Sequence, residues 1–489
     1  MRLHLVLTLA ALGPAVGEAQ DCSSATLIDA TTTSDVASSS PVTGSAQFGT
    51  GLSPVRREFV ELNGYRYFLA ETMQTGQELF RTDGTAAGTS LVADVRPGIE
   101  SSEILGLTVA HGKLWFEAND GVTGRELWTS DGTAAGTALV ADIGLGGLGG
   151  LHGDGAMFVT LGSRIYFVAD DGVHGDELWS SDGTSGGTSM VIDLAPGPDD
   201  GVSLGYLAAV PQSGRVVFTG TADASTHKLW STDGTAGGTL QLPPQGAHQL
   251  VPRLGLVFFI SENNLWRTDG TPAGTLKLSG YAPQPAGIYF TDLFDSAEVN
   301  GKLLYPGNWD KGWEVYVSDG TPAGTYEYLD LALWPTKNSN PAEFVHHAGH
   351  VYFTANDGTG RKLFRSTGHW NGTTQVFDPG TADPDLGPRA LTTHQGRLWF
   401  LRDTAAGGTE LWSTDGTPAG TVLEETEGGL TVARELTSLS ATELLFVASE
   451  PATGSELYTL PDGGGGATLV IDLATESPTH SSQPSFLTT

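Results

Sequence analysis

The chain has 489 residues and a formal net charge of −32, because 56 Asp and Glu outnumber 24 Lys and Arg. This charge disfavours binding to nucleic acid, whose phosphates would be repelled, and to a bare anionic membrane surface. The 67 glycines recur periodically, and no long stretch has helical periodicity, so the composition favours a repetitive all-β protein over disorder.

Residues 1–19 are typical of a secretory signal peptide. Arg2 supplies the positive end, residues 3–12 form an apolar run, and Gly17 and Ala19 fit a small-residue cleavage pattern. The run is too short to span a membrane, and no other candidate transmembrane segment follows. We therefore expect an exported protein that is secreted or held at the cell surface. Because Cys22 is the only cysteine, we expect no internal disulfide.

Residues 20–54 are rich in Ser, Thr and Ala and predict a flexible leader. Residues 55–475 form a repeat region, in which strand-sized apolar runs follow one another. Residues 476–489 form a C-terminal tail that ends in one more strand-like segment, 485–489. This segment either closes a ring by pairing with the opposite end of the array or caps an edge.

The repeat region contains nine copies of one motif, clearest as ELWSTDGTPAGT from Glu410. We interpret the motif as the third strand of a four-stranded unit, a tight turn, and the start of the fourth strand. Gly of the Asp-Gly pair accepts positive φ, and Asp bonds the backbone two residues on. The two Thr residues close the turn through their hydroxyls, and the second Gly suits a β-bulge. The nine copies begin at Glu78, Glu126, Glu177, Lys228, Asn264, Glu314, Lys362, Glu410 and Glu456.

Each unit also carries one aromatic residue in its second strand and one in its third, such as Phe116 and Trp128. The Leu-Trp pair of the motif places apolar side chains on both faces of the strand, so both faces must be covered. Stacked blades provide that cover. The sequence therefore predicts an all-β, β-propeller-like array of about nine four-stranded repeats, with an open β solenoid as the structural alternative.

The motif resembles that of bacterial ELWxxDGT-repeat proteins, also called hyalin-like, which are common in exported proteins of Gram-negative bacteria. The resemblance covers about residues 55–475 and implies export and a propeller-like array, but no particular activity. The sequence departs from the pattern at Thr367, which replaces the turn Asp, and at Asp462, where the turn is one residue longer.

Calcium is a candidate cofactor. Asp120, Asp171 and Asp357 lie in acidic turns between the second and third strands, and carboxylate oxygens are ligands that Ca²⁺ prefers. Simple hairpin turns explain these residues equally well. His346-His347 and His350, with nearby Asp357, form a further metal candidate, although surface hairpin histidines explain them too.

Glu occupies the first motif position in six of the nine copies. In a ring these carboxylates would also form a ring. Repetition argues for a structural role, and we interpret them as solvated strand residues rather than as a lining of the loop face.

Four tryptophans lie outside the repeated aromatic positions: Trp309, Trp313, Trp334 and Trp370. Exposed Trp stacks on sugar rings, so they suggest a glycan site near units six and seven. The alternative is that they pack against a blade.

The sequence contains no nucleophile elbow and no glycine-rich phosphate loop before a helix. Its features favour a non-catalytic interaction module of the cell surface or matrix, with an extracellular glycan or a protein as partner. An exported carbohydrate-active hydrolase or lyase is the first alternative and predicts shifted carboxylates in a central pocket. A structural spacer is the second and favours an open array.

Overall fold

The computed structural model describes residues 25–26, 59–72, 75–151, 158–221, 227–262, 264–278, 293–308, 312–332, 338–369, 371–427, 434–440, 443–450, 454–461 and 467–471. The expected signal peptide and the expected terminal strand at 485–489 lie outside these residues. Of the expected leader, only the two residues of β1 (Ala25–Thr26) are described, and they pair with β3 of the first sheet.

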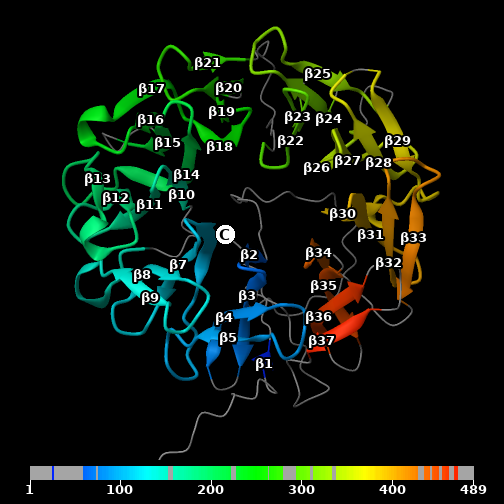
Figure 1. The fold of residues 1–489 in the computed structure, drawn as a ribbon. Coiled ribbons are helices and arrows are strands. Elements are labelled where there is room, and N and C mark those ends of the chain that lie inside the picture. The colour runs from blue at the N-terminus through cyan, green and yellow to red at the C-terminus, as the bar shows by residue number, and fades with distance from the viewer. Residues whose placement is uncertain are drawn as a thin grey trace, which may run out of the picture.

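The described residues form nine sheets of four consecutive antiparallel strands, arranged as the blades of a propeller (Figure 1). In each blade the first strand lies nearest the centre of the ring and the fourth lies outermost (Figure 1). The prediction of a propeller-like array is confirmed, and the chain does not form an open solenoid. We number the blades 1 to 9 in chain order.

The first five blades contain β2 to β21. Blade 1 consists of β2 (Val60–Leu62), β3 (Tyr65–Thr72), β4 (Gly76–Thr82) and β5 (Ser90–Ala93). Blade 2 consists of β6 (Leu105–Ala110), β7 (Lys113–Asn119), β8 (Arg125–Ser130) and β9 (Ala138–Ala141). Blade 3 consists of β10 (Val159–Leu161), β11 (Arg164–Asp170), β12 (Asp176–Ser181) and β13 (Ser189–Ile192). Blade 4 consists of β14 (Val202–Val210), β15 (Arg215–Gly220), β16 (Lys228–Thr232) and β17 (Leu240–Gln245). Blade 5 consists of β18 (His248–Arg253), β19 (Leu256–Ser261), β20 (Asn264–Thr268) and β21 (Leu276–Lys277).

The last four blades contain β22 to β37. Blade 6 consists of β22 (Ala297–Val299), β23 (Lys302–Asn308), β24 (Trp313–Ser318) and β25 (Tyr326–Leu329). Blade 7 consists of β26 (Ala342–His347), β27 (His350–Asn356), β28 (Arg361–Ser366) and β29 (Thr373–Phe377). Blade 8 consists of β30 (Pro388–His394), β31 (Arg397–Asp403), β32 (Thr409–Thr414) and β33 (Val422–Glu427). Blade 9 consists of β34 (Arg434–Ser438), β35 (Glu443–Glu450), β36 (Gly454–Pro461) and β37 (Thr468–Ile471).

Helix is almost absent from the described residues. It is limited to four single 3₁₀ turns, at Leu145–Gly147, Ser185–Gly187, Ala236–Gly238 and Pro384–Leu386. None of the described helices has the length and apolar character that crossing a membrane would require.

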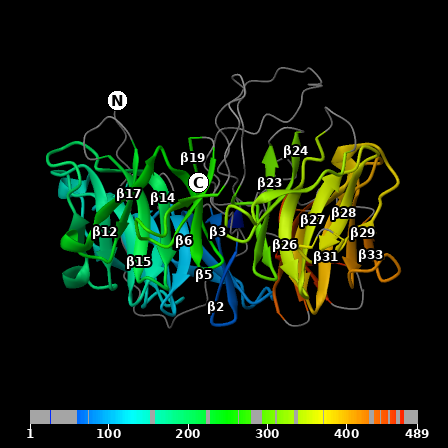
Figure 2. The same ribbon diagram turned by 90° about the horizontal axis from the view of Figure 1, so that it is seen from above.

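The strands run between two faces of the ring (Figure 2). Because the four strands of a blade are consecutive and antiparallel, the first and third hairpins lie at one end of the blade. The second hairpin and the joint to the next blade lie at the other end. We call these ends the motif face, which carries the Asp-Gly turns, and the joint face.

The two repeated aromatic residues of each unit are direct partners across the second and third strands. The pairs are Phe68–Phe80, Phe116–Trp128, Phe167–Trp179, Phe218–Trp230, Phe259–Trp266, Tyr305–Tyr316, Phe353–Phe364, Phe400–Trp412 and Phe446–Tyr458. The interpretation of the motif as the third strand is therefore confirmed. The apolar clusters span consecutive blades, as with Leu79 of blade 1 and Phe116 of blade 2, so burial holds each blade against the next.

The first and last blades pack together and close the ring. Phe80 of blade 1 shares a cluster with Leu445 and Leu457 of blade 9, and the two blades lie side by side in Figure 1. A Cβ on Gly84, in the turn of blade 1, would lie 2.2 Å from a methyl carbon of Leu439. Side-chain packing, without a strand exchanged between the blades among the described residues, therefore joins blade 9 to blade 1.

The Asp-Gly turn is a network of side-chain hydrogen bonds, as the sequence predicts. In blade 3, Asp182 Oδ1 accepts the main-chain N–H of Thr184 (2.9 Å) and its hydroxyl (2.7 Å). The hydroxyls of Ser181 and Thr188 lie 2.7 Å apart and close the base of the turn. Each hydroxyl of the motif thus satisfies a polar group that the strand ladder leaves unpaired.

The second glycine of the motif has another role than the predicted bulge. The register shift in blade 3 falls between the pairs Leu178–Ile192 and Trp179–Met190, so Val191 is the extra residue. Gly187 comes four residues earlier, and a Cβ placed on it would lie 2.0 Å from Asp182 Oδ1. It is glycine because the Asp carboxylate packs against its Cα.

We expect Gly187→Ala to lower the free energy of unfolding by about 1.5–3 kcal/mol, because Asp182 must leave its charge-assisted hydrogen bonds. Gly186→Ala is the matched control, since a Cβ there meets nothing within 4 Å. Denaturant unfolding of both variants measures the difference. In an Asp182→Ala background the cost of Gly187→Ala should largely vanish; an equal cost in both backgrounds would contradict the mechanism.

Candidate ligand site on blades 6 and 7

The first residue of the motif is buried in several blades, so its interpretation as a solvated strand residue is wrong. Glu126 has no exposed surface. Its carboxylate accepts the main-chain N–H groups of Ile143 (3.0 Å), Gly144 (2.8 Å) and Gly150 (2.8 Å). These groups belong to the joint between blades 2 and 3. The carboxylate satisfies donors that no strand pairs, and so ties the joint to the third strand.

The same arrangement recurs at three further glutamates, all without exposed surface. The joint donors are Val95, Arg96 and Ser102 for Glu78, Leu194 and Ala195 for Glu177, and Leu331 and Ser339 for Glu314. Burial raises the pKa of Glu78, Glu126 and Glu177 to about 7 and also raises the pKa of Glu314, although the hydrogen bonds oppose this. The residue paired with each glutamate in the second strand is Ala70, Ala118, Ala169 or Gly307.

Blade 7 replaces the glutamate with a lysine of opposite charge. The Nζ atom of Lys362 lies 2.8 Å from a carboxylate oxygen of Asp357 and 2.8 Å from one of Asp378. Asp378 follows β29 at the start of the next joint. The joint is thus again tied to the third strand, with the charges reversed.

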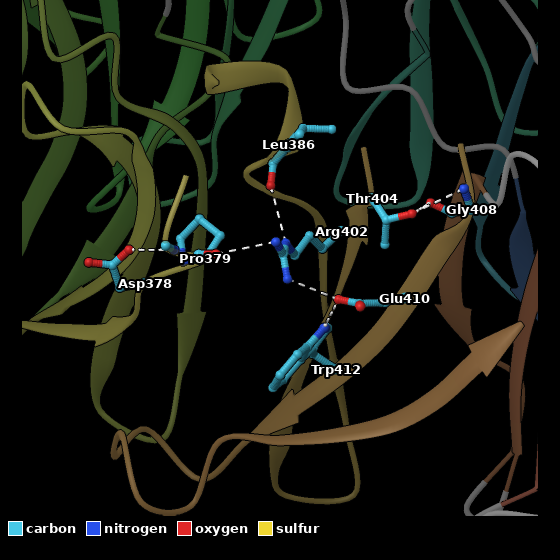
Figure 3. A network of polar contacts seen from close by, with 9 residues as sticks. Asp378, Pro379, Leu386, Arg402, Thr404, Gly408, Glu410 and Trp412 are labelled. Carbon is cyan, nitrogen blue, oxygen red and sulfur yellow. Dashed lines mark hydrogen bonds and ion pairs between the residues drawn. The ribbon is translucent and has the colours of Figure 1, made fainter. Parts of the chain in front are cut away.

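Blade 8 departs in a second way (Figure 3). Glu410 faces Arg402 instead of a small residue, and Arg402 Nη1 donates to Glu410 Oε2 at 3.1 Å. The same oxygen accepts the indole N–H of Trp412 at 2.9 Å. Arg402 also donates to the carbonyl oxygens of Pro379 and Leu386, at 3.2 and 3.4 Å, in the joint before the blade. Arg402 thus holds the joint before its own blade, whereas a glutamate such as Glu126 holds the joint after its blade.

The three aspartates of the calcium hypothesis lie on blades 2, 3 and 7, in separate turns. Asp120 Oδ1 accepts the N–H groups of Val122 and Thr123, both at 2.8 Å. Asp171 contacts the ring of His174 at 2.8 Å, and Asp357 contacts Lys362. The structure does not bring the three together, and each binds groups of its own blade. Among the described residues, no three His, Cys, Asp or Glu side chains are grouped to hold a metal ion. Calcium binding stays a prediction.

The candidate histidines lie on the first hairpin of blade 7, at the motif face. His347 and His350 are paired across the hairpin, and their rings contact the carbonyl oxygens of Gly396 and Ala348, both at 3.1 Å. Asp357 follows the far end of β27, at the joint face. The structure therefore separates it from the histidines.

Of the four candidate tryptophans, Trp309, Trp334 and Trp370 lie outside the described residues. Trp313 begins β24 and is half-buried. Its main-chain N–H donates to Asn338 Oδ1 at 3.1 Å, and its main-chain carbonyl oxygen accepts the N–H of Ser339 at 2.9 Å. Trp313 is therefore joined to the segment between blades 6 and 7.

A pocket of about 280 Å³ opens at this joint, lined by Asn338, Asn340, Asn356 and Gly358. Glu314 positions it: Ser339 donates its N–H (3.1 Å) and its hydroxyl (2.6 Å) to that carboxylate, which fixes the asparagines on either side. Asn356 in turn donates its N–H to the Ser339 carbonyl oxygen at 2.7 Å. Glu314 thus fixes Ser339, and Ser339 in turn bonds the main chain of Asn356, so the three asparagines lie around one opening.

These asparagines were not predicted from the sequence. The signals for them were the Asn-Ser-Asn sequence at 338–340 and the Asn-Asp-Gly turn at 356–358, but only the folded joint places them together. The oxygens of Asn338 and Asn356 accept main-chain N–H groups, of Trp313 and Gly358 respectively. Their NH₂ groups are the parts suited to donate to a ligand.

The sequence matches no protein-family model, and no curated protein matches it. Among solved structures it is similar to an S511A mutant of puromycin hydrolase complexed with PGG, with 18% identity, TM-score 0.33, and coverage of 64% of this chain and 52% of that one. It is also similar to oligopeptidase B from Trypanosoma brucei, with 12% identity, TM-score 0.37 and coverage of 66% and 49%. A third is the β-propeller domain of the Trilobed protease from Pyrococcus furiosus, with 12% identity, TM-score 0.31 and coverage of 65% and 98%. The chain spans about half the length of the first two, and these similarities assign it no activity.

Proposed function

We propose that this protein is an exported binding module that holds an extracellular glycan at the joint face of blades 6 and 7. The observation that carries the proposal is the pocket of Asn338, Asn340 and Asn356, next to the segment bonded to Trp313. Carboxamides donate and accept hydrogen bonds without charge, which suits sugar hydroxyls. An aromatic ring nearby can stack on a sugar face. Export and membership of the ELWxxDGT-repeat family remain predictions from the sequence.

The charge of the protein narrows the class of glycan. A chain with a net charge of −32 repels polyanions, so we expect a neutral glycan. The repeated carboxylates with raised pKa are not candidates for catalysis, because each one is used to hold a joint. An active site would require a few residues that break the repeat.

A neutral-glycan array probed with the full chain tests the proposal, with calcium and again with EDTA. We expect binding to a defined polymer, weakened at least tenfold by Asn356→Ala and Asn338→Ala. Asn119→Ala is the matched control, because Asn119 Oδ1 accepts the N–H of Gly121 at 2.8 Å as Asn356 accepts that of Gly358. If binding occurs with calcium and is lost in EDTA, the result would show that the site requires calcium. If no glycan binds either with calcium or with EDTA, the glycan proposal is refuted, and a protein partner or a structural role is favoured.

A hydrolase is the second candidate, and the carboxylate of Glu343 favours it. Burial raises the pKa of Glu343 to about 7, and the nearby charge of Asp295 acts in the same direction. Asp295 itself accepts the N–H groups of Glu343 and Phe344, at 2.7 and 2.8 Å. A carboxyl group whose pKa lies near 7 can act as a general acid or a general base. Release of reducing ends from a bound polymer, abolished by Glu343→Gln, would establish this function. Binding without release would exclude it for that polymer.

A further inference from the structure

A second opening lies at the inner strands, nearer the motif face. The first strand of blade 6, β22, has three residues, whereas β18 and β26 on either side have six each. A pocket of about 700 Å³ is found there, and its lining includes Arg253, Glu298 and His346. This volume is in the range of small-molecule sites. The hairpins of blades 5 and 6 border it, so it is distinct from the asparagine pocket at the joint face.

Two side chains of opposite charge lie on its wall and link blade 5 to blade 6. Arg253 Nη2 donates to the carbonyl oxygen of Ser296 at 3.1 Å, and Nη1 donates to that of Pro252 at 3.0 Å. In the other direction, Glu298 Oε1 accepts the N–H of Leu254 at 2.7 Å. These bonds fix both charged groups on rigid elements, which prepares them for a ligand.

The guanidinium is well suited to receive an anion. Both acceptors named above are neutral carbonyl oxygens, and a guanidinium carries five N–H donors. Burial lowers the pKa of Arg253, and the charge of Glu298 opposes this. A bound carboxylate would therefore supply charge compensation that the burial of Arg253 calls for. Glu298 uses one oxygen for Leu254 and has a second for a cation.

The rest of the lining has a polar part, with Ser296, Asn300 and His346, and an apolar part. Ala297, Val299 and Phe344 are buried and contribute to the lining. A ligand that fits has an anionic group, a cationic group and an apolar body between or beside them. Such a zwitterion has no net charge, so the overall charge of −32 does not repel it.

We propose that this pocket binds a small zwitterion with an apolar side chain, an amino acid or a dipeptide. Its carboxylate pairs with Arg253 and its ammonium group pairs with Glu298. The hydrophobic side chain lies against Phe344 and Val299. The site is independent of the glycan proposal, since it lies on other residues at the other end of the blades.

Isothermal titration of the full chain with the dipeptide Gly-Phe tests the proposal. We expect saturable binding. Acetylation of the amine should weaken the affinity at least tenfold, and conversion of the carboxylate to an amide should also weaken it at least tenfold. If Gly-Phe and free phenylalanine both fail to bind, or if both blocked forms bind as well as Gly-Phe, the proposal is wrong.

Glu298→Gln sharpens the test, because the amide oxygen can still accept the N–H of Leu254 while the charge is removed. This substitution should weaken the binding of Gly-Phe at least tenfold. Glu61→Gln is the matched control. Glu61 precedes the Asn-Gly hairpin of blade 1 as Glu298 precedes that of blade 6, and it contacts Arg66 at 2.9 Å. This substitution should leave the binding of Gly-Phe unchanged. Equal weakening by both substitutions would show a general effect of charge and overturn the assignment.

Discussion

Glu126→Ala is expected to destabilise the protein severely. The substitution leaves the main-chain N–H groups of Ile143, Gly144 and Gly150 without their acceptor in a buried joint. Each buried unpaired donor costs about 1–3 kcal/mol, so we expect a loss of roughly 3–6 kcal/mol, reduced where water reaches the joint. Denaturant unfolding followed by tryptophan fluorescence measures it.

Glu100→Ala is the control for this experiment, because Glu100 is exposed in the neighbouring joint, and its loss should change stability by less than about 0.5 kcal/mol. Glu126→Gln should lie between the two, since an amide oxygen accepts fewer of the three bonds. If Glu126→Ala is as stable as Glu100→Ala, the carboxylate does not anchor the joint.

The free energy of unfolding is expected to fall as pH rises from about 4.5 to 7. Burial raises the pKa of Glu78, Glu126 and Glu177 to about 7 in the folded protein, from an ordinary value of 4.5. In this window the folded state holds protons that the unfolded state has released, so raising the pH favours unfolding. The contribution of these groups is fully present below pH 4.5 and is lost by the time pH passes 7. Each group contributes on the order of 2–3 kcal/mol to the change.

The turn aspartates do not interfere with this measurement. Hydrogen bonds from threonine side chains lower the pKa of Asp131, Asp182 and Asp415 below their ordinary value of 3.8. Their contribution to stability is therefore present above pH 3.8 and is lost only in more acidic solution. Urea unfolding at pH 5, 6, 7 and 8 should give steadily smaller free energies up to pH 7. The Glu126→Gln variant should show a shallower slope, and a stability that rises from pH 5 to 7 would contradict the assignment.

Much of the fold followed from the sequence because its determinants are local. Asp182 and Thr184 are two residues apart, so the turn they form could be predicted from the motif alone. The recurring aromatic positions could also be recognised, because an aromatic residue stands at the same two places in every unit, but their pairing across the strands was not predicted. The position of the bulge at Val191 could not be predicted, because it depends on how the fourth strand pairs with the third.

The candidate site was predictable only as a region. The tryptophans outside the repeat indicated units six and seven, and the main-chain N–H of Trp313 does bond Asn338 of the asparagine pocket. The asparagines themselves belong to a joint and a turn about 18 residues apart in sequence (Asn338 and Asn356). Ordinary polar residues at such separation have no signature until the chain is folded.

The strands, the turns and the number of repeats could be predicted from the sequence, since each of these rests on contacts within one unit. The fold was needed to show that the ring is closed, because Gly84 of the first blade and Leu439 of the last blade meet although they lie far apart in the sequence. It also decided that the motif glutamates are buried. A strand residue that is polar in sequence is expected to face water, and its partners, the unpaired N–H groups of the joint, come from a segment with no fixed pattern. Burial of a carboxylate becomes favourable only where those groups converge on it.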